Sequence, residues 1–143
     1  MGLLSCIVAA DESACVELGE SLRPLDEWSG IEAPGLDGEK MALLHCLLTG
    51  DEYAIALTLQ EPVYVSDSGV CVLRVADSVV EKLAAHEDDT LADLAVELAA
   101  AADFEIDAWA VEDVHALLVE FGELARLAES QAQTLFVWIC PRQ

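Results

Sequence analysis

The 143-residue chain contains 28 Asp and Glu residues and six Lys and Arg residues, which gives a formal net charge of −22, and 55% of its residues are hydrophobic. This apolar content excludes a disordered chain, and no run reaches the ~18 uncharged apolar residues of a membrane span. The charge would repel nucleic acid and an anionic membrane surface, so we expect neither as a partner. The length suits one hydrophobic core, and we expect a single domain over residues 1–143.

The cysteines and the first residues bear on the compartment. Five cysteines are widely scattered, odd in number and without a Cys-x-x-Cys pair, which is typical of reduced thiols. The first ten residues are apolar but carry no basic leader of the kind found in signal peptides. These features favour a cytoplasmic protein.

The first elements follow from the apolar pattern. Residues 3–9 form a continuous apolar run, which predicts a strand buried on both faces. Asp11 begins a predicted helix that runs to residue 22. Over residues 23–36 the prolines and glycines predict a loop, which contains Trp28.

The most clearly bounded helix is predicted over residues 36–50. Asp37 can cap its first turn, and Gly50 can adopt the left-handed conformation that ends a helix. Between these ends the leucines and a methionine recur at helical spacing, so we expect most of this helix to be buried. The inward side chains are Met41, Leu43, Leu44, Leu47 and Leu48.

The second half of the chain alternates short strands and helices. Residues 51–60 fit a helix or an extended segment equally well. Thr90, with Asp93 three residues later, resembles a capping box at the start of a helix. Strands are predicted over residues 63–65, 70–75 and 134–140, and helices over residues 77–85, from Thr90 to residue 98, and over residues 112–130.

The two apolar strands at the ends of the chain predict that the termini lie side by side in one sheet. Helices packed on that sheet give an α+β domain. We therefore expect a small antiparallel or mixed sheet that includes the N- and C-terminal strands, with several packed helices.

The acidic charge is concentrated in one segment. From Leu83 to Ala125 there are twelve carboxylates and no Lys or Arg. Such a segment is either a solvated face that keeps the protein soluble or a docking surface for a basic protein partner. For the second interpretation, Trp109 or Trp28 would supply an aromatic anchor. The candidate partner-binding residues are Glu87, Asp88, Asp89, Asp103, Glu105, Asp107, Trp109, Glu112 and Asp113.

No motif in the sequence indicates a reaction. The histidines His45, His86 and His115 are not arranged with other ligands as a metal site, and no Gly-rich phosphate loop or nucleophile elbow is present. We interpret His45 as a core or boundary histidine with one nitrogen hydrogen-bonded. We expect no catalytic residue, cofactor or metal, although a small metal-assisted hydrolase centred on His45 or His115 remains an alternative hypothesis.

The segment around His45 resembles the YfbM-like family of bacterial proteins. The resemblance rests on Leu36-Asp37, Lys40, Leu44-His45 and Leu48-Thr49-Gly50, and on the same order of strands and helices elsewhere in the chain. It implies no catalytic residues. It does imply an immunity protein, encoded beside a secreted antibacterial toxin such as those of type VI secretion, that binds and neutralises this basic toxin in the cytoplasm. A regulatory module that binds a protein other than a toxin is the remaining alternative.

Overall fold

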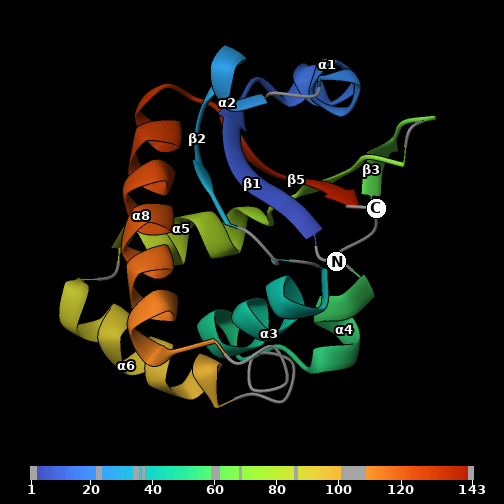
Figure 1. Ribbon diagram of the computed structural model, residues 1–143. Coiled ribbons are helices and arrows are strands. Elements are labelled where there is room, and N and C mark those ends of the chain that lie inside the picture. The colour runs from blue at the N-terminus through green and yellow to red at the C-terminus, as the bar shows by residue number, and fades with distance from the viewer. Residues whose placement is uncertain are drawn as a thin grey trace.

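The computed structural model describes residues 3–21, 24–33, 36, 38–58, 62–67, 69–85, 87–100 and 109–141. Its centre is a five-stranded antiparallel sheet in the order β2-β1-β5-β4-β3 (Figure 1). The strands are β1 (Leu3–Ala10), β2 (Ser29–Glu32), β3 (Pro62–Val65), β4 (Cys71–Arg74) and β5 (Thr134–Pro141).

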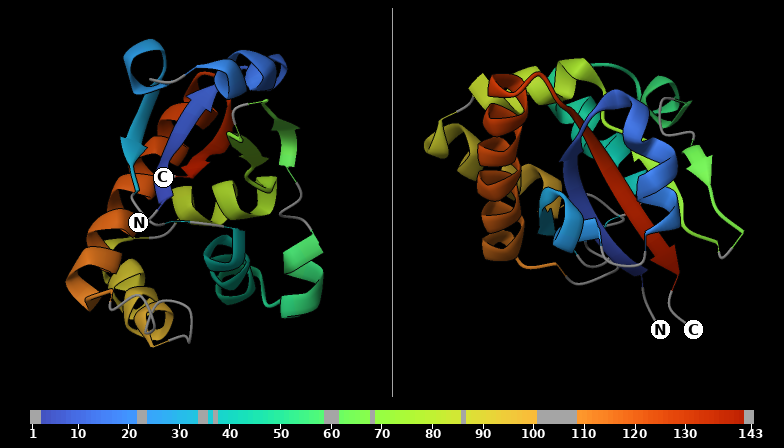
Figure 2. Two further views of the ribbon diagram at one scale, coloured as in Figure 1. Left: turned by 45° about the vertical axis from the view of Figure 1, so that its right-hand side comes forward. Right: turned by 90° about the horizontal axis from the view of Figure 1, so that it is seen from above.

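Helices cover both faces of this sheet (Figure 2). One face packs against α3 (Gly38–Thr49), α5 (Asp77–Ala85), α6 (Asp88–Ala99) and α8 (Val111–Ser130), which together form the larger core. The other face packs against α1 (Cys15–Glu20) and α2 (Pro24–Glu27) in a smaller core. The short helices η1 (Glu12–Ala14) and α4 (Tyr53–Thr58) complete the described elements. The predicted α+β class is confirmed.

The N- and C-terminal strands are neighbours at the centre of the sheet. β1 pairs with β5 in an antiparallel register that runs from Leu3 opposite Pro141 to Ala10 opposite Thr134. Successive side chains alternate between the faces. Ile7 packs in the larger core, whereas Val8 packs in the smaller one, and both are 0% exposed. The predicted burial of β1 on both faces and the adjacency of the two strands are therefore confirmed.

The long helix α8 supplies much of the larger core. Its apolar residues at helical spacing are all buried, and Phe121 is 0% exposed. These residues are Val114, Leu117, Leu118, Phe121, Leu124, Ala125 and Ala128. The stripe of α6 from Leu91 to Leu98 is buried as well. Burial of one stripe, rather than intrinsic propensity, therefore accounts for these helices.

The loop predicted over residues 23–36 is wrong, because this stretch contains α2 and β2. Pro24 begins α2, where its missing N–H costs nothing and its fixed φ suits a helix. Gly30 lies within β2 because the strand approaches β1 closely there. A Cβ at Gly30 would lie 2.4 Å from the Ile7 carbonyl oxygen. Both residues resemble loop signals, but each has a structural role inside an element.

Smaller corrections concern helix ends. The first helical segment divides into η1 and α1 and ends at Glu20, two residues before the predicted end. α6 begins at Asp88 with Glu87 as its N-cap, so Thr90 lies in the first turn and is not the cap. Asp89 lies in that first turn, near the positive end of the helix dipole, which favours the earlier start.

The central helix is confirmed as α3, with Met41, Leu44 and Leu48 buried. Leu47 was predicted to be buried but is 40% exposed, because it lies at the edge of the stripe. The predicted cap Asp37 lies outside the described residues. Of the two alternatives for residues 51–60, the helical one is observed as α4. No helix in the described part of the chain is both long and apolar enough to cross a membrane.

Candidate functional site

The predicted partner-binding residues fall on α6, on α8 and in the segment that joins them. Glu87 and Asp89 are exposed at the start of α6, and Glu112 and Asp113 are exposed in the first turn of α8. Trp109 is partly buried against the larger core. Asp88 is in α6, but its side chain, like all of Asp103, Glu105 and Asp107, lies outside the described residues.

The described carboxylates among them, at Glu87, Asp89, Glu112 and Asp113, do not form one tight cluster. A Cβ at Gly122, in the middle of α8, would lie 3.1 Å from the Leu83 carbonyl oxygen and 3.7 Å from Leu91 Cδ1. The start of α6 therefore packs near the middle of α8. Gly122 is about 13 Å further along α8 than Asp113, at 1.5 Å per residue. The acidic groups at Glu87 and at Asp113 therefore lie at different levels along α8.

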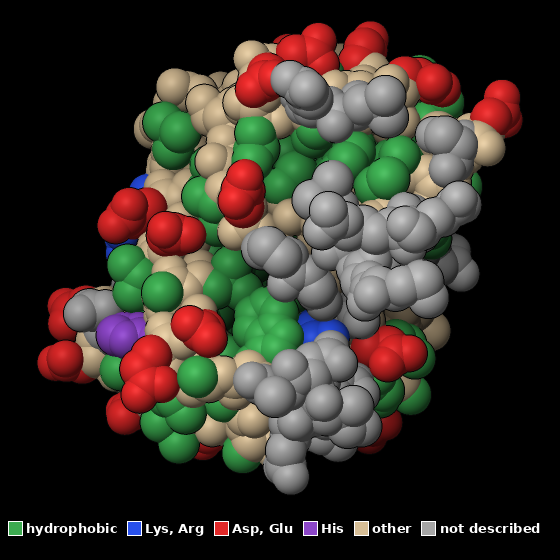
Figure 3. Space-filling model, in the orientation of Figure 1, with side chains coloured by type: hydrophobic (Ala, Val, Ile, Leu, Met, Phe, Trp, Pro, Cys, Tyr) green, Lys and Arg blue, Asp and Glu red, His purple; other side chains and the backbone are tan. Residues whose placement is uncertain are grey.

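Hydrophobic side chains lie among the carboxylates on the face of the molecule that Figure 3 shows. Val96 of α6 is 57% exposed, and Val111 and Leu127 of α8 are 40% and 37% exposed. Carboxylates on the same two helices, including Asp93, Glu97, Glu120 and Glu123, are exposed too. Exposed apolar and exposed acidic side chains thus both occur on α6 and α8.

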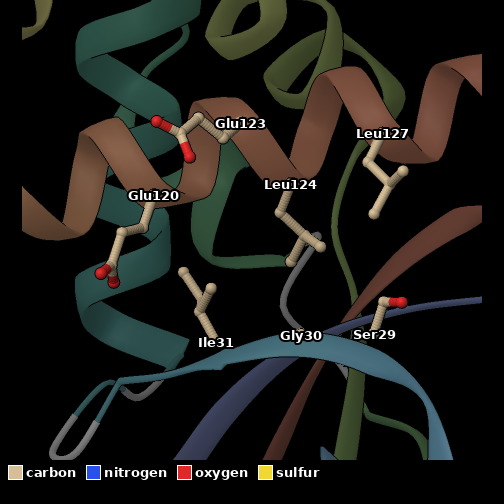
Figure 4. Close-up of a pocket in the computed structure, with 7 residues that line it drawn as sticks. All are labelled: Ser29, Gly30, Ile31, Glu120, Glu123, Leu124 and Leu127. Atoms are coloured by element: carbon tan, nitrogen blue, oxygen red, sulfur yellow. The ribbon is translucent and has the colours of Figure 1, made fainter.

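A groove lies between the edge strand β2 and α8 (Figure 4). Its volume is about 430 Å³, within the usual range of ligand pockets. Ile31 points from β2 toward α8, and Leu124 and Leu127 point from α8 toward β2. Glu120 and Glu123 carry the carboxylates of the groove, and Ser29 and Gly30 complete its lining.

Sequence reasoning missed this groove. Glu120 and Glu123 belong to the acidic segment, but nothing in the sequence pattern distinguishes them from its other carboxylates as partner-binding residues. Sequence reasoning also predicted a loop where β2 lies. The run Ser29–Glu32 has no apolar alternation that would indicate a strand, and prolines and glycines flank it.

Most of the described cationic side chains are engaged within the protein. Lys40 is only 2% exposed. Arg74 lies 3.2 Å from the Asp77 carboxylate, and Arg126 Nε donates to the Ala84 carbonyl oxygen at 3.0 Å. Positive charge that could offset the carboxylates toward a partner is therefore scarce on the described surface.

His45 is a core histidine, as predicted. It is 1% exposed, and its Nε2 donates to Asp51 Oδ2 at 2.7 Å. This hydrogen bond lowers the pKa of the Asp51 carboxyl from its ordinary value. His45 Nδ1 is buried and has no hydrogen-bond partner in the structure as described. The pair ties the end of α3 to the segment before α4.

The described residues contain no group of three or more His, Cys, Asp or Glu side chains placed to hold a metal ion. His115, the other centre considered for a hydrolase, is partly buried on α8. His86 lies outside the described residues.

Two of the cysteine thiols, Cys6 and Cys46, have a raised pKa and are therefore poor nucleophiles. All five cysteines lie in described segments, and none forms a disulfide. Burial, with a smaller effect of the Glu32 carboxylate, raises the pKa of Cys6 to about 12. Burial and Asp51 also raise the pKa of Cys46. A thiol with a raised pKa carries little thiolate at neutral pH.

The fold and the surface define an acidic α+β protein with an antiparallel sheet and an edge groove. No protein-family model matches the sequence, and no curated protein matches it significantly. Among solved structures, the chain is similar to the crystal structure of a protein of unknown function, YfbM from Escherichia coli. The TM-score is 0.48 and the identity 12%, over 95% of this chain and 99% of that chain.

Proposed function

We propose that this protein is a cytoplasmic immunity protein, which binds a cognate basic antibacterial toxin through its acidic surface and thereby neutralises it. The observation that carries the proposal is the combination of exposed carboxylates and exposed apolar side chains on α6 and α8. Val96, Val111 and Leu127 lie among carboxylates on the same helices. The carboxylates can attract a basic partner, and the exposed apolar groups on the same helices can contact it.

The net charge supports the same function through the rate of association. A field of one sign steers a partner of the opposite sign and can raise the association rate constant to about 10⁸–10⁹ M⁻¹s⁻¹ at low salt. A protein that must capture a toxin before it damages the cell benefits directly from fast capture. Inhibition by binding also requires no catalytic group.

Co-purification with the product of the adjacent gene tests the proposal. We expect a stable complex that weakens as salt rises, because screening shortens the reach of surface charges. The triple variant Glu87→Lys, Asp88→Lys, Asp89→Lys should weaken the complex and flatten its salt dependence.

The matched control is Asp11→Lys, Glu17→Lys, Asp26→Lys, which changes the charge equally at exposed positions near the smaller core. Equal weakening by both triple variants would show that net charge, and not the α6 surface, drives binding. A complex with a product that is not toxic would instead support the regulatory-module alternative. Absence of any complex would refute the proposal.

A further inference from the structure

The strand β2 offers an open edge. It is the outermost strand at one end of the sheet, and β1 is its partner among the described strands. The Ala33 N–H donates to the Ser5 carbonyl oxygen at 3.0 Å, so Ala33 faces β1. Alternate residues of a strand direct their backbone groups to opposite sides. Gly30 and Glu32 therefore direct their N–H and C=O groups away from β1.

These outward groups are available to a further strand. Apart from the ladder with β1, no backbone hydrogen bond between described residues uses Gly30 or Glu32. Exposed sheet edges of this kind pair with extended segments of other chains, and protein complexes use the same pairing for recognition.

The groove lies alongside this edge. Leu124, which is 5% exposed, forms its floor, and the more exposed Leu127 forms part of its wall. Glu120 extends from α8 toward β2 beside Ile31 (Figure 4). A segment paired with β2 would thus meet apolar side chains and two carboxylates of α8.

We propose that the β2–α8 groove and the open edge of β2 bind an extended segment of the protein partner that carries Lys or Arg. The backbone of this segment pairs with Gly30 and Glu32. Its apolar side chains contact Ile31 and Leu127, and its cations reach Glu120 and Glu123. This inference rests on the proposed function, since it names the site by which that partner is recognised.

Charge complementarity selects this occupant. A second copy of the chain would bring the same carboxylates and the same net charge of −22. An anionic small molecule would be repelled by Glu120 and Glu123. A cationic segment gains from both carboxylates, and backbone pairing gives it affinity without a particular sequence.

The first test uses a defined peptide and the full ¹⁵N-labelled chain. The probe is the acetylated and amidated peptide Thr-Lys-Thr-Val-Thr-Arg-Thr, whose Lys, Val and Arg lie on one face of a strand, and the matched peptide carries Glu in place of Lys and Arg. We expect saturable changes in the amide signals of Gly30 and Glu32 with the cationic peptide. The acidic peptide should produce none.

Two double variants distinguish binding in the groove from general attraction of the cationic peptide to the negatively charged protein. Glu120→Gln with Glu123→Gln should weaken the peptide about fivefold, the effect of two exposed ion pairs. The control pair, Asp11→Asn with Glu17→Gln, removes the same charge at exposed positions near the smaller core and should change affinity less than about twofold. An equal loss in both pairs would overturn the proposal, and so would absence of binding.

The edge has its own test. Glu32→Pro removes an outward N–H, which an edge strand tolerates, and should weaken the peptide about tenfold. Glu32→Gln controls for the lost charge and should have a smaller effect. Equal effects of the two variants would exclude backbone pairing. Because the probe is not a toxin, the two proposals can fail separately. If the peptide binds in the groove but no toxin is neutralised, only the proposed function is refuted. If a toxin is neutralised but the peptide does not bind, only the groove as the binding site is refuted.

Discussion

The substitution Gly30→Ala tests the strand on which the candidate site depends. The new Cβ would lie 2.4 Å from the Ile7 carbonyl oxygen and 2.7 Å from Leu25 Cδ2. Real Cβ atoms do not approach within 3.0 Å, so β2 must move away from β1 by at least about 0.6 Å. Overpacking costs about 1–3 kcal/mol, and weakened ladder hydrogen bonds add about 1 kcal/mol.

Alanine also restricts the unfolded chain, which offsets about 0.4–1 kcal/mol of this cost. The expected loss in the free energy of unfolding is therefore about 1–3.5 kcal/mol. In urea, with a slope of about 2 kcal/mol/M, the unfolding midpoint should fall by about 0.5–1.8 M. The neighbouring Ser29→Ala is the control, since Ser29 is exposed, and should shift stability by less than about 0.5 kcal/mol. A Gly30→Ala variant as stable as its parent would refute the close pairing of β2 with β1.

Three further substitutions or treatments test other parts of the structure. Phe121 is 0% exposed, so Phe121→Ala should lower the free energy of unfolding, measured by thermal unfolding, by about 3–5 kcal/mol. Glu120→Ala should lower it by less than about 0.5 kcal/mol. Similar losses in the two variants would contradict the orientation of α8. The hydrogen bond from His45 lowers the pKa of the Asp51 carboxyl in the folded protein below its ordinary value of 3.8. The stability that this hydrogen bond contributes is therefore complete above the pKa of Asp51 in the unfolded chain, and it is lost as pH falls through the pKa in the folded protein. The stability difference between the parent and Asp51→Asn should therefore narrow below about pH 4, and a constant difference would contradict the pairing. Cys6 should resist iodoacetamide at pH 8 in the folded protein and react in urea, as followed by mass spectrometry; labelling of the folded protein would contradict its burial and raised pKa.

The sequence predicts those elements whose burial follows a regular period. β1, β5 and α8 are recognisable because their apolar residues either run continuously or recur at helical spacing. β2 is not recognisable, because Gly30 and the nearby prolines indicate a turn by their local preferences alone. The close approach to Ile7 that requires glycine is a tertiary contact, and local sequence does not encode it.

The same distinction applies to the candidate site. The acidic segment is visible in the sequence, since its charge is a matter of composition. Which carboxylates lie beside a groove depends on how α8 packs on β2, two elements separated by about 80 residues. The sequence therefore shows that Glu120 and Glu123 belong to the acidic segment, but it does not show that they line a groove.

The His45 segment illustrates a partial success. Its helical spacing and Gly50 define α3, and Gly50 does adopt a positive φ of 80°. The buried position of His45 also follows from the pattern. Its hydrogen bond to Asp51 does not, because it depends on how the chain turns after α3.

Growth of cells that express the adjacent gene, with and without this protein, tests the central claim most directly. The account predicts that the adjacent gene alone stops growth and that co-expression restores it. The variant Glu120→Gln with Glu123→Gln should restore growth less well than Asp11→Asn with Glu17→Gln at equal protein levels. An adjacent gene that is toxic and is not counteracted by this protein would contradict the account, and so would one that is harmless.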